Sequence, residues 1–449
     1  MSEHPERTAT ALPVEALYTR CDPAALPFET TAELEPLEEI GGQRRAAEAV
    51  RFAVGMAHDG YNLFAFGPEG TGKYSFMRRY LERAASEAST PPDWCYVNNF
   101  EEPHRPKALN LPAGKACPFR DDMAQLVEEL KLAIPAAFES DEHRNRKSAI
   151  QEQFKERQEE GFGKLQARAK EHDIVLIRTP VGLALAPIRD GEVLNPKEFD
   201  ALPEDEKQSR RAVSEDLQKD LEALLHQIPG WEREQRQELR DLDRETTMFA
   251  VGHLIDELKR KWQEETAVIA HLEAVSNDVI DNAEAFLPRE AEGPQILFGG
   301  KAPSGSAIVR RYQVNVIVDQ TRRKGARSSE SAEGAPVVYE DHPTQPNLVG
   351  RTEHIAQFGT LVTDFNLIKG GALHRANGGW LILDAHKLLT QPYAWESLKR
   401  ALRSERIRIE SPAESLGWAT TTTLEPEPIP LAVKIVLLGE PLLYYLLMH

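Results

Sequence analysis

The apolar residues of this chain follow two patterns. Short continuous apolar runs, which are typical of buried β-strands, occur at 61–66, 94–98, 337–339, 379–384 and 433–438. Apolar residues at helical spacing lie beside these runs, at 40–56, from Ser75 onward and at 394–404. Because strands alternate with helices, the pattern predicts an α/β fold built on a parallel sheet.

The middle of the chain, from about 121 to 286, is dense in Glu, Lys, Arg and Gln. Leucines and other large apolar residues from Leu217 to Trp231, and again from Val251 to Trp262, are spaced alternately four and three apart, which is a heptad seam. A weaker helical pattern covers 141–172, and the stretch 174–194 between the helices has strand and turn signals. We expect an antiparallel helical arm with a small β tip. A solvated helical hairpin without chemistry of its own is the alternative.

A glycine-rich turn follows the first predicted strand. Its residues match the first seven positions of the phosphate-loop motif GxxxxGK[ST], between a strand and a helix as that motif requires: Gly67, Pro68, Glu69, Gly70, Thr71, Gly72 and Lys73. The glycines allow a backbone whose amides surround phosphate at a helix N-terminus. Lys73 would bridge the β- and γ-phosphates of ATP. Tyr74 stands where Ser or Thr normally binds Mg²⁺, and Ser75 comes one residue late.

The run 380–385 is a hydrophobic strand that ends in Asp384. In a parallel sheet this carboxylate would lie beside the phosphate loop, where it could hold Mg²⁺ directly or through water. The alternative role of Asp384 is a helix cap at the end of the strand. An active hydrolase usually has Glu next, but Ala385 cannot act as a base. His386 could do so only if the backbone turned it inward.

Taken together, GPEGTGK at 67–73 and ALHRANGGWLILDAHKLL at 372–389 resemble the AAA-plus ATPase part of bacterial Lon-like proteases, in particular the Lon-related subgroup with a long coiled-coil insertion. Further similar runs are IGGQRRAAEAVRFAV, RPKALNLPAG, PNLVGRTEH and VKIVLLGEPLLYYLL. The resemblance implies an ATP-dependent serine endopeptidase, in which a hexameric ring of ATPase modules feeds unfolded or damaged proteins into a Ser-Lys proteolytic chamber.

The resemblance also implies roles for single residues. Residues 67–73 would bind the nucleotide and Asp384 would be the metal acid, with ATP and Mg²⁺ as cofactors. Gly439 and Glu440 lie where many AAA-plus proteins have a polar sensor residue. Arg375 either contacts the nucleotide of a neighbouring subunit or makes structural hydrogen bonds in its own chain.

The implied organisation has four parts. A loosely ordered N-terminal arm covers 1–36, the first half of the AAA-plus core covers 37–120, the inserted helical domain covers 121–300, and the second half of the core covers 301–449. After Leu438 there is no room for the helical lid or the protease domain, so we expect no catalytic Ser-Lys dyad in this chain. We also expect strand 61–66 to be a sheet edge, and the chain to be an N-terminal piece or a truncated product.

The amino-acid composition argues against several other classes of protein. The 449 residues include 54 Lys and Arg against 72 Asp and Glu, a net charge of −18, and 41% are hydrophobic. This composition excludes a wholly disordered chain. The acidic balance argues against nucleic-acid binding, although GALHRANGG also resembles DNA-associated ATPases. Three cysteines without metal spacing fit a reducing cytoplasm, and no apolar run is long enough to span a membrane. A hydrolysis-deficient, nucleotide-gated scaffold is the alternative function.

Overall fold

The computed structural model describes residues 12–34, 43–56, 58, 60–179, 182–189, 192–193, 203–287, 309–321, 334–357, 360–410 and 424–448. Most of the charged loop predicted at 322–335 lies outside these residues. None of the described helices is both long and apolar enough to cross a membrane.

A four-stranded parallel sheet forms the first body of the molecule. Its strands are β1 (Leu63–Phe66), β16 (Lys434–Gly439), β13 (Trp380–Asp384) and β8 (Val337–Glu340), in that order across the sheet. All neighbours are parallel. Among the described strands β1 pairs only with β16, so it lies at one edge of this sheet.

Helices cover both faces of this sheet, as a parallel sheet requires. Side chains of α1 (Arg44–Gly55) and α2 (Lys73–Glu87) pack on one face with Trp380 and Ile382. The alternate residues Leu381 and Leu383 point to the other face. The helices there are α9 (Gln345–Val349), α10 (Ala372–Arg375), α11 (Ala385–Thr390) and α12 (Ala394–Ser404). A last helix, α14 (Pro441–Met448), follows β16.

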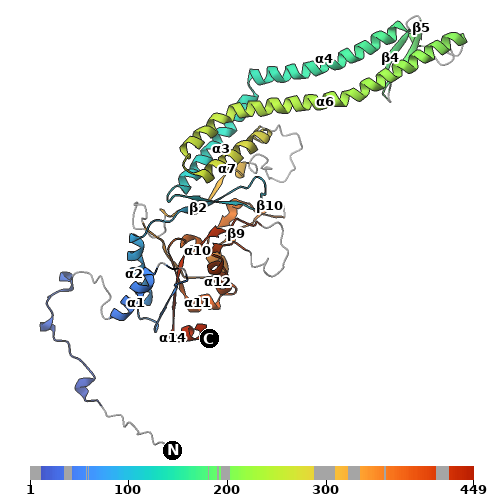
Figure 1. Ribbon diagram of the computed structural model, residues 1–449. Coiled ribbons are helices and arrows are strands. Elements are labelled where there is room, and N and C mark those ends of the chain that lie inside the picture. The colour runs from blue at the N-terminus through green and yellow to red at the C-terminus, as the bar shows by residue number, and fades with distance from the viewer. Residues whose placement is uncertain are drawn as a thin grey trace, which may run out of the picture.

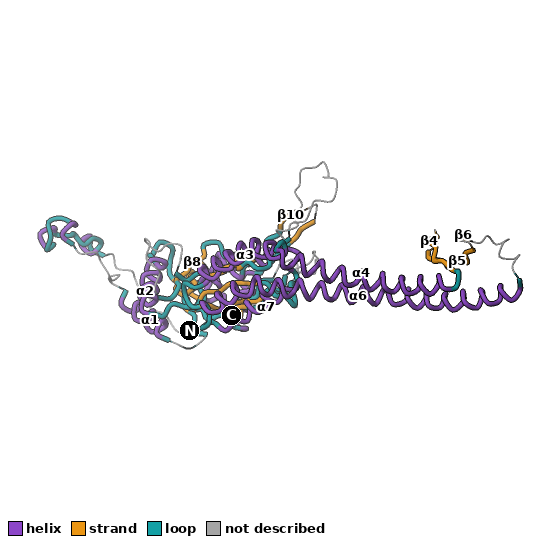
Figure 2. Tube along the Cα trace, turned by 90° about the horizontal axis from the view of Figure 1, so that it is seen from above, coloured by secondary structure: helices purple, strands orange, loops and turns teal. Residues whose placement is uncertain are grey.

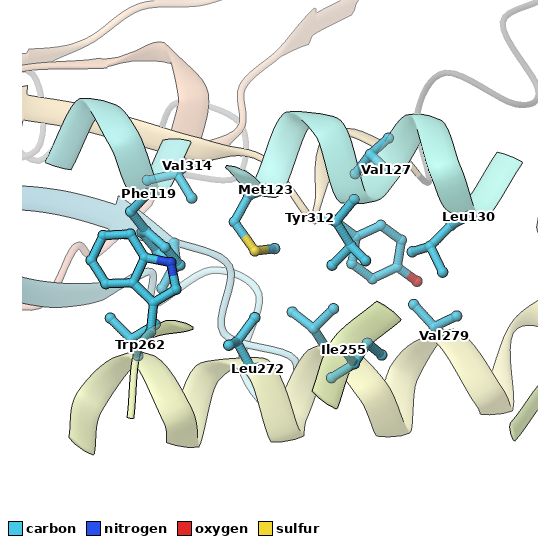
Figure 3. Packing of buried hydrophobic residues seen from close by; sticks show 14 of the residues in the cluster. Phe119, Met123, Val127, Leu130, Ile255, Trp262, Leu272, Val279, Tyr312 and Val314 are labelled. Atoms are coloured by element: carbon cyan, nitrogen blue, oxygen red, sulfur yellow. The ribbon is translucent and has the colours of Figure 1, made fainter. Parts of the chain in front are cut away.

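A second, antiparallel sheet has the order β3 (Lys107–Leu111), β2 (Asp93–Val97) and β7 (Val314–Val318). The apolar run at 94–98 therefore forms a strand outside the parallel sheet. This sheet packs against α3 (Ala116–Phe138), α6 (Glu204–Lys261) and α7 (Thr266–Asp281) in the largest buried cluster. Figure 3 shows part of that cluster, in which Phe119, Met123 and Leu130 of α3 face Trp262, Leu272 and Val279.

The helix α4 (Asp141–Glu171) runs beside the far part of α6 and away from both sheets (Figures 1 and 2). Ion pairs such as Arg146–Glu245 and Arg157–Glu234 join the two helices. At the far end lie the strands β4 (Ile174–Thr179), β5 (Gly182–Arg189) and β6 (Glu192–Val193). Whether the pair behaves as a coiled coil stays a prediction.

The remaining described elements are short. Two-stranded ladders join β9 (Arg351–Thr352) to β12 (Ile368–Lys369), β10 (Ile355–Gln357) to β11 (Thr360–Val362) and β14 (Arg406–Ile407) to β15 (Ile429–Pro430). Single 3₁₀ turns are η1 (Val14–Ala16), η2 (Pro23–Ala25), η3 (Thr31–Glu33), η4 (Ala283–Phe286) and η5 (Phe365–Leu367).

Candidate nucleotide-binding site

The glycine-rich turn connects β1 to α2, and its backbone has the conformation that the glycines permit. Gly70 and Gly72 have φ angles of 76° and 75°, in the left-handed region that side chains disfavour. Gly72 directly precedes the first turn of α2. The Gly67 amide donates to the Gly439 carbonyl at 3.2 Å, and the Thr71 hydroxyl donates to the Pro68 carbonyl at 2.8 Å. The loop is thus fixed to the neighbouring strand, with its amides at a helix N-terminus.

The Lys73 ammonium is held inside this loop. Its Nζ donates to the carbonyl oxygens of Gly67 and, at 3.1 Å, of Pro68. Glu69 at the turn and Ser75 on the first turn of α2 are exposed. Lys73 is therefore the residue of the loop that can exchange a backbone carbonyl for a phosphate oxygen.

The Tyr74 side chain contacts two neighbouring residues, Tyr339 and Arg78. Its ring packs against Tyr339 of β8 with ring centroids 4.6 Å apart. Its hydroxyl accepts a hydrogen bond from Arg78 Nη1 at 3.2 Å. The side chain that replaces the usual Ser or Thr is therefore a packing residue in this structure.

Asp384 lies at the same edge of the sheet as the phosphate loop. Leu438 of β16 is level with Asp384 on one side and with Ala65 of β1 on the other. Asp384 Oδ1 accepts the Lys387 amide at 2.9 Å and caps α11, the alternative role expected from the sequence. Its second oxygen, Oδ2, has no hydrogen-bond partner among the described residues. The cap therefore leaves one carboxylate oxygen for a water or a metal.

The two residues after Asp384 differ in burial. Ala385 is 1% exposed, and a Cβ built on Gly439 would lie 3.2 Å from the Ala385 Cβ and 2.8 Å from Phe64. The end of β16 is thus closely packed against both side chains, which explains why residue 439 is glycine. His386 is exposed.

The pair His374–Arg375 has structural contacts within the chain. Arg375 Nη2 lies 2.8 Å from Glu340 Oε2, an ion pair between α10 and the end of β8. His374 Nδ1 accepts the Gly371 amide at 3.2 Å. Burial, together with the charge of Arg375, lowers the pKa of His374 to about 3, so the ring is neutral at pH 7. Sequence reasoning missed the contacts of Tyr339 and Glu340, which are the last residue of an inconspicuous three-residue apolar run and the residue directly after it.

No group of three or more His, Cys, Asp or Glu side chains that could hold a metal ion occurs in the part of the chain that the structure describes. A cation at this edge would therefore rely on Asp384, water and the phosphates of a bound nucleotide.

Comparison with known proteins agrees with this geometry. Residues 333–449, which contain β8, β13, β16 and Asp384, match the family model "LonB-like, AAA domain". Residues 93–126, which contain β2, β3 and the start of α3, match the model "Lon-like LonC helical domain". The phosphate loop at 67–73 precedes both matched ranges.

A curated relative is the protein named "Putative Lon protease homolog" of Escherichia coli (strain K12). It is 26% identical over an alignment of 216 residues, which covers 44% of this chain and 33% of the relative. The match therefore spans a third of that relative's length. Together with the two family models, it supports the Lon-like family that the sequence predicted.

Proposed function

We propose that this chain is the ATP-binding AAA-plus portion of a Lon-like, ATP-dependent serine protease, and that it engages protein substrates for degradation. The observation that carries the proposal is the shared sheet edge. The phosphate loop follows β1, Asp384 ends β13, and only β16 lies between them. The Lon-like AAA match over 333–449 agrees with this assignment.

The residues of the loop fit the triphosphate of ATP. Gly70 and Gly72 are left-handed, and turns with such residues can direct backbone amides into an anion-binding concavity. The N-terminal end of α2 adds a favourable dipole. Lys73 would leave the Gly67 and Pro68 carbonyls and bind phosphate oxygens. We therefore assign Gly67, Pro68, Glu69, Gly70, Thr71, Gly72, Lys73, Tyr74 and Ser75 to the nucleotide site, with Tyr74 as a packing residue.

The fit for Mg²⁺ rests on fewer groups. Asp384 Oδ2 can accept from a metal-bound water while Oδ1 keeps the helix cap. The Tyr74 hydroxyl is directed to Arg78 and supplies no ligand in this arrangement. Mg²⁺, when bound, neutralises phosphate charge during phosphoryl transfer. In this proposal Asp384 holds it through water.

The other parts of the proposal follow from the family. Six copies of the chain would assemble into a ring, as the resemblance to Lon-like proteases implies. The helical arm formed by α4 and α6 would contact unfolded protein. Cytoplasmic location agrees with three free cysteines, of which Cys95 and Cys117 are buried. We assign no residue of this chain to peptide-bond hydrolysis, and a DNA partner is disfavoured by the net charge of −18.

Titration calorimetry with ATP tests the loop. Lys73→Ala should weaken ATP binding at least about tenfold, since a charge-assisted contact contributes roughly 1.5–3 kcal/mol. Lys155→Ala on α4 is the matched control and should bind like the unchanged chain. Equal affinity of Lys73→Ala and the control would overturn the assignment.

Asp384→Asn separates the two roles of this residue. Asparagine still caps a helix, so folding should be unchanged, while the dependence of ATP affinity on Mg²⁺ should fall. If Mg²⁺ strengthens ATP binding equally in both chains, Asp384 is a cap only.

The alternative function, a nucleotide-gated scaffold without hydrolysis, has its own support. Ala385 occupies the position of the usual catalytic Glu in a closely packed site, and Tyr74 is engaged with Tyr339. The two functions differ in turnover. Phosphate release that is lost in Asp384→Asn would favour the ATPase, whereas ATP binding without release would favour the scaffold.

A further inference from the structure

The N-terminal arm, defined here as residues 12–34, exposes an unusual amount of apolar side chain. Val14 is 78% exposed and Tyr18 is 71% exposed. No residue of the three short turns η1, η2 and η3 is buried. The other large apolar residues exposed on the arm are Leu12, Leu17, Leu26 and Leu34.

Local hydrogen bonds nevertheless define the arm. The Asp22 carboxylate accepts the Ala24 amide at 3.0 Å and caps η2. Glu33 Oε1 accepts from both the amide and the hydroxyl of Thr30, each at 3.1 Å. The turns are thus organised without a core of their own, and a segment of this kind gains its apolar burial by binding another surface.

The arm is acidic and a nearby pair of helices is basic. Residues 12–34 contain Glu15, Asp22, Glu29 and Glu33 against Arg20, a net charge of −3. By contrast, α1 carries three arginines and one glutamate, and α2 carries four basic and two acidic residues. Each helix therefore has a net charge of +2 in a chain of −18. Opposite charges of this kind orient two surfaces as they meet.

The same two helices present an apolar side chain to solvent. Phe52 on α1 is 67% exposed, and its neighbour Arg51 lies over the Tyr80 ring of α2 with 6.0 Å between guanidinium carbon and ring centroid. Aromatic rings beside arginines are the residues that dominate protein interfaces. We define the α1–α2 face as the exposed side of these helices around Arg45, Arg51 and Phe52. Its positive charge and its exposed apolar side chain complement the acidic residues and the exposed apolar side chains of the arm.

We propose that the arm of one copy binds the α1–α2 face of a second copy of this chain. In Figure 1 the arm extends away from α1 and α2 of its own chain, and Phe52 stays exposed there. A neighbouring copy presents the same α1–α2 face, and the arm can reach it without folding back onto its own chain. This proposal rests on the ring assembly that the proposed function includes. It identifies the arm as the segment that joins neighbouring copies in that ring.

Cys21 allows the arm to be observed directly. It is the exposed cysteine of the arm, whereas Cys95 and Cys117 are buried, and burial raises the pKa of the Cys95 thiol. A maleimide fluorophore should therefore label Cys21 selectively, with Cys21→Ser as the labelling control. Fluorescence anisotropy is then measured while the chain is diluted, and sedimentation of the same samples reports the association state.

Binding in a second copy predicts that anisotropy and association state fall together on dilution. The double variant Leu17→Ser, Tyr18→Ser should weaken self-association at least about tenfold, because it removes two apolar side chains that the second copy would bury. Arg45→Glu should weaken it in the same way, and adding Glu15→Arg should restore part of the loss. Arg233→Glu on α6 is the matched charge control and should have no effect.

Three results would overturn the proposal. Anisotropy that stays high at dilutions where sedimentation shows single copies would mean that the arm binds its own chain. Anisotropy that is low at every concentration, or self-association that is unchanged in the Leu17/Tyr18 variant, would mean that the arm does not join copies. Calorimetry of ATP binding on the same variants keeps this outcome separate from a failure of the nucleotide site, because none of these residues belongs to the phosphate loop.

Discussion

Active AAA-plus hydrolases usually have glutamate at the position that Ala385 occupies in this chain. Substituting Ala385 by glutamate should destabilise the folded chain rather than increase ATP hydrolysis. Ala385 is 1% exposed, and the adjacent end of β16 leaves so little space that even a methyl group on Gly439 would approach the Ala385 Cβ to 3.2 Å. Ala385→Glu adds a methylene and a carboxylate at this contact.

The expected cost has two parts. Inserting extra atoms into a packed site typically costs about 1–3 kcal/mol, and enclosing an unpaired polar group adds about 1–3 kcal/mol or more. We therefore expect a loss of at least about 3 kcal/mol from a free energy of unfolding that is about 5–15 kcal/mol for a typical domain.

Urea unfolding followed by circular dichroism measures this loss, and His386→Glu is the control. His386 is exposed, so the same new side chain one residue later should change stability by less than about 0.5 kcal/mol. An Ala385→Glu chain that unfolds at the urea concentration of the unchanged chain, and that hydrolyses ATP faster, would refute the reasoning.

Three further predictions concern the rest of the molecule. Leu272→Ala in the α7 core, where Leu272 is fully buried, should destabilise the chain by about 2–5 kcal/mol in urea unfolding, and a change below 1 kcal/mol would contradict the packing in Figure 3. Burial lowers the pKa of His374 from its ordinary 6.5 to about 3. Between these two pH values His374 is protonated in the unfolded chain and neutral in the folded chain. Stability should therefore fall as the pH drops from 6.5 toward 3, and His374→Gln should flatten this slope in pH-dependent unfolding. Finally, of the three thiols only Cys21 should react quickly with a maleimide in the folded chain, because thiolates react and Cys95 and Cys117 are buried; mass spectrometry showing early double labelling would contradict this.

The sequence predicted the elements that have strong local signals. Period and motif located the strand before the phosphate loop, the strand that ends in Asp384 and the helix at 394–404. It could not predict the partners of these elements. The Tyr74 ring packs against Tyr339, which is remote in the chain. The motif alone therefore showed only that a phenol replaces the usual short Ser or Thr hydroxyl. The pairing direction of β2 was equally hidden, because a short apolar run fits a buried strand in either kind of sheet.

The HRANGG run at 374–379, which is part of the resemblance, lies where the two sheets meet. Asp93 at the start of β2 accepts the Gln320 amide at 2.8 Å, and Gln320 Nε2 donates to the Asn377 carbonyl at 3.5 Å. Asn377 in turn donates to the Pro430 carbonyl at 2.8 Å and accepts the Ala432 amide at 2.8 Å. Asn377 thus ties the two parts together: its backbone carbonyl accepts from Gln320 after β7, and its side chain holds the segment that leads into β16.

The glycines beside Asn377 make this junction sterically feasible. Gly378 has a φ angle of 80°, and a Cβ there would lie 2.4 Å from Pro91. A Cβ on Gly379 would lie 2.1 Å from the Pro336 carbonyl oxygen at the start of β8. The turn at 377–379 therefore packs against the segments that lead into β2 and into β8, and β13 begins directly after it and ends at Asp384. The antiparallel sheet and the helices packed on it are therefore joined to the parallel sheet at the start of β13, the strand that ends at Asp384.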